Sequence, residues 1–90
     1  MSAPFCNIDQ APAFAFGFQT LSELIGDRMG GPMECEHGNS ENGDTLQQTT
    51  TGLAFYRANT NTPTFTDGFL HWALTPRGLV TWSGTNIDPP

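Results

Sequence analysis

Apolar and polar residues alternate with the two-residue period of a β-strand along much of the second half of the chain. Side chains two apart on a strand point to the same face. Residues 69–75 and 79–83 therefore predict a hairpin, closed by the turn Pro76-Arg77-Gly78. Trp72 is expected opposite Val80 or Trp82. One face of this hairpin is expected to form the floor beneath a helix, through Leu70, Trp72, Leu74, Val80 and Trp82.

Earlier residues predict further strands. Residues 33–37 predict a first strand, and Asn42-Gly43 is typical of a tight turn after it. Residues 45–57 predict one long strand, bent near its middle by a glycine. Residues 58–67 predict a threonine-rich connection at a sheet edge, because Pro63 cannot donate to a strand ladder.

A helical pattern precedes the strands. Thr20 and Glu23 fit a capping box at the start of a helix within residues 18–30. The Gly30-Gly31-Pro32 run is expected to end this helix. Its apolar stripe would pack on the sheet through Leu21, Leu24, Ile25 and Met29.

The expected fold class is α+β. One short N-terminal helix packs on an antiparallel β-meander of three to five strands, crossed by an extended N-terminal arm. We expect residues 1–90 to form a single domain, with an arm at 1–17, a sheet within 33–84 and a tail at 85–90. The arm is expected to lie flat because Phe14, Phe16 and Phe18 alternate at period two.

Composition narrows the possible partners. The 90 residues carry nine acids, three arginines and no lysine, for a net charge of −6. Such a surface repels phosphate, so neither nucleic acid nor an anionic membrane surface is expected as a partner. No apolar run approaches the roughly 18–20 residues that cross a bilayer, so no membrane insertion is expected.

The two cysteines, Cys6 and Cys35, lack the spacing of a zinc site, and no metal or other cofactor is expected. They form either one disulfide or two small buried side chains. The disulfide is favoured, because a small acidic domain gains on the order of 3 kcal/mol from closing such a loop. A disulfide in turn predicts a secreted or cell-surface protein.

The sequence patterns typical of catalytic sites are weak, and we expect that this chain is not an enzyme. Cys35 and His37 share a strand face and could form a thiolate–imidazole pair, unless Cys35 is bridged. Glu34, Glu36 and Asp44 could serve acid–base chemistry or hold calcium, but a solvated acidic hairpin end is the simpler interpretation.

Aromatic and amide side chains predict a carbohydrate platform instead. Sugar faces stack on aromatic rings, and amides or carboxylates bind the hydroxyls. Tyr56 and His71 are expected to be exposed, whereas the simpler interpretation of each tryptophan is a place in the core. The candidate ligand-binding residues are Gln48, Tyr56, Asp67, His71, Trp72 and Trp82.

A resemblance to other proteins also favours a binding role. The chain resembles a short module of exported bacterial proteins that has no settled role, through residues 26–32, 35–37, 42–57, 60–68 and 71–75. More distantly, residues 24–26, 31–32, 48–56 and 80–84 are similar to the LGFP repeat of envelope proteins. That repeat's Gly-Phe-Pro core is missing here, and the spacing is longer. The resemblance implies a secreted anchoring module and carries over no catalytic residue.

The sequence therefore predicts a non-catalytic extracellular binding or anchoring module for a cell-wall or other glycan. The alternative is a structural unit that self-associates through a sheet edge or through its phenylalanine-rich arm.

Overall fold

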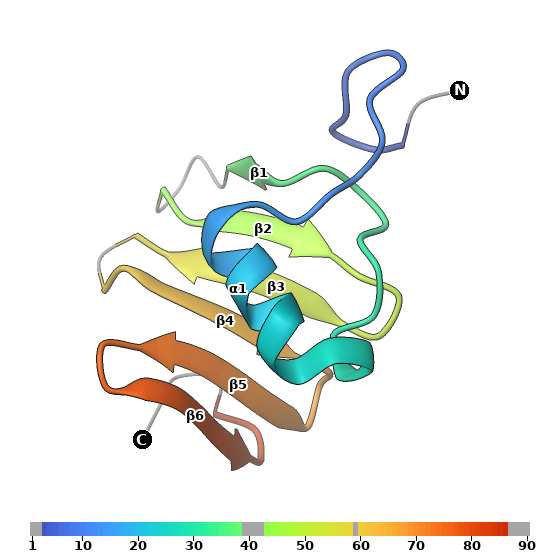
Figure 1. The fold of residues 1–90 in the computed structure, drawn as a ribbon. Helices are drawn as coiled ribbons and strands as arrows, with labels where there is room; N and C mark the ends of the chain where they lie inside the picture. Colours follow the sequence, from blue (N-terminus) through green and yellow to red (C-terminus); the bar gives the residue numbers. More distant parts are fainter. Residues whose placement is uncertain (1–2, 39–42, 59, 87–90) are drawn as a thin grey trace.

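The structure of the chain, a computed structural model, describes residues 3–38, 43–58 and 60–86. Within them, helix α1 (Phe16–Ile25), continued by the 3-10 turn η1 (Gly26–Arg28), lies on one face of an antiparallel sheet (Figure 1). The strands pair in chain order, so the sheet is a meander. They are β1 (His37–Gly38), β2 (Thr45–Gln48), β3 (Leu53–Arg57), β4 (Thr62–Thr66), β5 (Leu70–Thr75) and β6 (Gly78–Ser83).

The predicted α+β class and antiparallel meander are confirmed, but the sheet has six strands rather than three to five. One reason is that residues 45–57 form two strands joined by a turn instead of one bent strand. In this turn the Thr49 hydroxyl accepts the N–H groups of Thr51 and Gly52, at 3.2 and 3.0 Å. A Cβ at Gly52 would collide with the Thr66 carbonyl, so glycine is required where β3 begins beside β4.

The other reason for the higher strand count is β4, which was predicted to belong to a connection at the sheet edge. That assignment is wrong, because β4 lies between β3 and β5. Pro63 pairs with Tyr56 of β3, and the pairing with β5 begins only at Thr64, beyond the proline. The proline ring packs on α1 at Gly17, where any Cβ would collide with it. The proline thus sets the closest approach of helix and sheet.

The first strand is shorter than predicted, because only His37–Gly38 pairs with β2 as a strand. The segment before it is held by separate backbone bonds. The Met33 N–H donates to the Gln48 carbonyl at 2.9 Å, and the Cys35 N–H donates to the Pro4 carbonyl at 3.1 Å.

Helix α1 begins earlier than predicted, and the predicted capping box is wrong. Its N-cap is Ala15, which offers no side-chain hydrogen bond, while the Thr20 hydroxyl donates to the Phe16 carbonyl inside the helix. Leu24 is 54% exposed and lies off the packed stripe. The side chains that face the sheet from this helical stretch are Phe18, Leu21, Ile25 and Met29.

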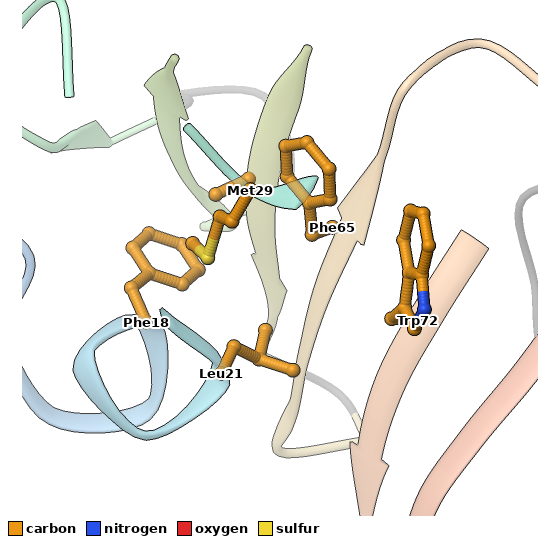
Figure 2. Close-up of a cluster of buried hydrophobic side chains, with 6 residues drawn as sticks. Phe18, Leu21, Met29, Phe65 and Trp72 are labelled. Carbon is orange, nitrogen blue, oxygen red and sulfur yellow. The ribbon is translucent and has the colours of Figure 1, made fainter. Parts of the chain in front are cut away.

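The hydrophobic core lies between α1 and the sheet (Figure 2). Phe65 of β4 and Trp72 of β5 stack, with ring centroids 5.6 Å apart. They meet Phe18, Leu21 and Met29 from the helical side, and all five side chains are buried. We call this side of the sheet the helix face.

The β5–β6 register differs from the one predicted. The two-residue turn Pro76-Arg77 sets Thr75 opposite Gly78, which brings Trp72 opposite Thr81. Trp82 therefore lies opposite His71, on the other face. The predicted shared floor is wrong for β6, because turn length fixes which side chains share a face. We call the face opposite α1 the back face. It carries Phe55, Thr64, His71, Val80 and Trp82.

The N-terminal arm loops out beside β1 first and then runs over β2 to the start of α1, where Phe14 packs against the core (Figure 1). Its anchor is the predicted disulfide between Cys6 and Cys35, which is confirmed. The end of the predicted tail, residues 87–90, lies outside the described residues.

Candidate functional site

A cleft of about 590 Å³ opens on the helix face, where the N-terminus of α1 meets the ends of several strands. Tyr56 comes from the end of β3, and Leu74 and Thr75 come from the end of β5. Thr45 begins β2, and Glu36 precedes β1. The walls thus combine one aromatic ring, aliphatic carbon, hydroxyls and a carboxylate.

Phe16 is the most unusual lining residue. It is the first residue of α1, is 87% exposed, and has a φ of 53°. A bulky side chain in this left-handed region costs of order 1–2 kcal/mol, and no burial offsets it here. The fold therefore holds an aromatic ring in water at the mouth of the cleft, at a cost in stability.

A second strained residue lies at the same cleft. Asn61, in the loop between β3 and β4, has a φ of 54° and also lines the cleft. The Tyr56 hydroxyl donates to Asn61 Oδ1, so the ring and the amide hold each other in place. Strained backbone of this kind concentrates at ligand clamps and active sites.

Of the six residues predicted to bind a ligand, only Tyr56 lines this cleft. Trp72 is 4% exposed and belongs to the core. Asp67 lies in the β4–β5 turn, at the opposite end of the sheet. Gln48, His71 and Trp82 lie on the back face in one row across the strands.

Two members of the back-face row, His71 and Trp82, each place a ring nitrogen at hydrogen-bond distance from a backbone carbonyl of the segment after β6. The expectation that His71 is exposed is wrong, because its side chain is fully buried and its Nε2 lies 2.8 Å from the Gly84 carbonyl. The Trp82 ring tilts against His71 at 5.3 Å, and its indole N–H donates to the Asn86 carbonyl at 2.6 Å. Gln48 is exposed at the far side of the row.

Asp67 has a structural role in its turn. Its Oδ1 accepts the N–H groups of Phe69 and Leu70 at 3.0 and 2.8 Å. Both bonds lower the pKa of the Asp67 carboxyl below its ordinary value, and the bond from Phe69 has the larger effect.

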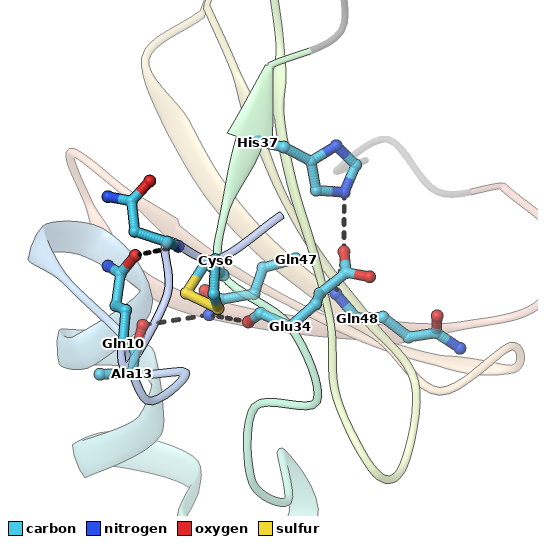
Figure 3. Close-up of a disulfide and its surroundings, with 9 residues drawn as sticks. Cys6, Gln10, Ala13, Glu34, His37, Gln47 and Gln48 are labelled. Carbon is cyan, nitrogen blue, oxygen red and sulfur yellow. Dashed lines mark hydrogen bonds and ion pairs between the residues drawn. A yellow bond between two sulfur atoms is a disulfide. The ribbon is translucent and has the colours of Figure 1, made fainter. Parts of the chain in front are cut away.

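The two glutamates predicted to share a strand face have separate roles. Glu34 is buried, and its Oε2 lies 2.7 Å from His37 Nε2 and accepts the Gln48 N–H at 3.0 Å (Figure 3). The buried Gln47 amide donates to the carbonyls of Glu34 and Ala13, which ties the arm to β2. Glu36 is exposed and lines the cleft.

The described residues contain no group of three or more His, Cys, Asp and Glu side chains that could hold a metal ion. Asn42 of the predicted Asn42-Gly43 turn and most of the possible calcium loop fall on residues 39–42, which lie outside the described part of the chain. The cysteine nucleophile considered above is ruled out, because Cys35 is bridged.

The chain matches no family model, no curated protein and no solved structure. The resemblance to envelope repeats therefore stays a prediction. No helix in the described ranges is long and apolar enough to cross a membrane.

Sequence reasoning missed most of the lining residues, including the aromatic, hydroxyl and amide side chains of Phe16, Thr45, Asn61 and Thr75. The cleft joins segments far apart in the chain, and no motif links them. Phe16 belongs to the period-two alternation of Phe14, Phe16 and Phe18, so the sequence pattern did not mark it as the exposed member of that set.

Proposed function

We propose that this chain is an extracellular module that binds a neutral glycan in the cleft at the N-terminus of α1. The observation that carries the proposal is Phe16, an exposed aromatic ring held in a strained backbone conformation at the mouth of the cleft. Sugar rings present apolar C–H faces that stack on such a ring.

The remaining lining groups suit a sugar. The Tyr56 ring and the Asn61 amide lie together, and Thr45 and Thr75 add hydroxyls. Such groups form the small polar set that fixes a ligand's orientation in an otherwise apolar cleft. None of the described lining residues carries a positive charge, and Glu36 carries a negative one, which favours neutral over anionic glycans.

One further observation favours binding over hydrolysis, and another favours a location outside the cell. Glu36 is the one carboxylate among the described lining residues, whereas glycoside hydrolysis commonly uses a pair. The Cys6–Cys35 disulfide is typical of an oxidising compartment.

The test is a glycan array with neutral and uronate-containing oligosaccharides, followed by calorimetric titration of any neutral glycan that binds. Phe16→Ala should weaken binding about tenfold or more, which corresponds to about 1.4 kcal/mol. Phe69→Ala is the matched control, because Phe69 is 63% exposed in the turn at the other end of the sheet. Absence of binding to any neutral glycan, or equal losses in the two variants, would contradict the proposal.

A further inference from the structure

Strand β6 forms an open edge of the sheet. It pairs with β5 on one side, and no described strand pairs with its other side. Natural edges are usually blunted by charges, proline or bulges. Residues 78–86 contain no charged residue and no proline, and the β5–β6 register runs without a bulge from Leu70 to Thr75. The opposite edge, β1, is only two residues long.

The alternation of hydrogen bonds between β5 and β6 shows which backbone groups of β6 point to the open side. The Gly84 N–H donates to the Phe69 carbonyl at 2.9 Å, which makes 69 and 84 a hydrogen-bonded pair. Such pairs alternate along an antiparallel ladder, so Trp82 and Val80 also direct their N–H and C=O groups toward β5. Leu79, Thr81 and Ser83 therefore direct theirs outward, to the open side.

We infer that a second copy of this chain pairs with β6 in antiparallel orientation, about a two-fold axis at Thr81. In this register Thr81 lies opposite the partner's Thr81, and Leu79 lies opposite the partner's Ser83, so each outward N–H meets a carbonyl. Val80 then lies opposite the partner's Trp82 in the closer, non-hydrogen-bonded position. This β-branched–aromatic pair occurs twice on the back face.

Two observations favour a second copy over another partner, and a third favours the register centred on Thr81. The edge is self-complementary, as an isologous two-fold contact requires. The register centred on Val80 would instead set Gly78 against the partner's Trp82 and lose both aromatic pairs. Each copy carries a net charge of −6, yet no charge lies in β6, so two copies can meet there without like charges in direct opposition.

The first test is light scattering after size exclusion over a range of concentrations. Thr81→Lys sets two lysines against each other at the axis and should raise the dimer dissociation constant about tenfold or more. Gln19→Lys adds the same charge on the exposed side of α1 and should leave the dimer intact. Circular dichroism checks that both variants fold. A chain that stays monomeric, or a dimer that Thr81→Lys leaves unchanged, overturns the inference.

The second test fixes the register. The axis brings the Cα atoms of the two copies of residue 81 to about 5.5 Å, within the range of a disulfide. Mild oxidation should therefore cross-link Thr81→Cys into a covalent dimer. Leu79→Cys is the control, because the two copies of residue 79 lie about 13 Å apart in this register. Preferential cross-linking of Leu79→Cys overturns the proposed axis.

Discussion

The two tryptophans lie on opposite faces of one sheet and serve different purposes. Trp72 is 4% exposed beneath α1 and stacks on Phe65. Trp82 is half-buried on the back face, beside His71, and its indole N–H is used by the chain's own C-terminal segment. The helix face is therefore covered by α1, whereas the rings of His71 and Trp82 on the back face contact each other and the segment after β6.

The difference shows where a ligand can be held. On the helix face the covering layer ends at the N-terminus of α1, and the cleft lies there, with Phe16 left outside the core. The back face offers a row of residues whose His71 is buried and whose Trp82 already has a partner. The edge of the layer formed by α1, and not the back face, holds the better candidate site.

The largest expected effect separates the two tryptophans. Trp72→Ala should lower the free energy of unfolding by about 3–5 kcal/mol, because it removes a buried ring and leaves a cavity. Trp82→Ala should lower it by about 1 kcal/mol, because its ring is half-exposed. Denaturant titration measures both, and equal losses would contradict the contrast between the faces.

The next effect concerns the disulfide, which holds the arm beside the helix face. Replacing Cys6 and Cys35 together by serine should lower the free energy of unfolding by about 3 kcal/mol, because the unfolded chain regains the freedom of the loop. Reduction of the unaltered chain is the control and should give a similar loss. A loss below about 1 kcal/mol would show that the arm is held without it.

A smaller effect has the opposite sign. Phe16→Gly should raise the free energy of unfolding by about 1 kcal/mol, because glycine adopts a positive φ without strain. The same change should weaken glycan binding. Phe69→Gly is the control, and its stability should not rise. If Phe16→Gly destabilises the fold, the ring packs more than its exposure indicates.

The smallest effect is the pH dependence from Asp67. Because backbone N–H donation lowers its pKa below the ordinary 3.8, its stabilisation is present above that value and is lost as pH falls through the folded pKa. Asp67→Asn should therefore melt below the unaltered chain at pH 7, and this difference should shrink in acid. Glu23→Gln, on the exposed side of α1, controls for removing one negative charge. A difference that persists unchanged in acid would contradict this role of the carboxylate.

Local patterns predicted the class of the fold and most of the strands. The turn at Pro76-Arg77 and the alternation around Trp72 were correctly read, and the cysteine pair was correctly assigned to a disulfide. The start of the helix was predicted wrongly. The helix begins at Phe16, before the apparent cap at Thr20, because this places Phe18 in the core. Tertiary packing outweighed a local capping signal.

The faces and the cleft could not be predicted for a geometric reason. A shift of one residue in register exchanges the faces of a strand, and this is how Trp82 came to be assigned to the wrong side. The close contact between Pro63 of β4 and Gly17 of α1 joins two residues far apart in the chain. The same holds for the cleft, which Phe16, Tyr56 and Asn61 line only once α1 has packed on the sheet.

The most direct test of the cleft is an amide-resonance titration of the isotopically labelled chain with a neutral glycan from the array. The account predicts that the largest shifts fall on Phe16, Tyr56 and Asn61, and that Phe16→Ala abolishes them at the same glycan concentration. Largest shifts on Gln48 and Trp82 would place the ligand on the back face and contradict the account.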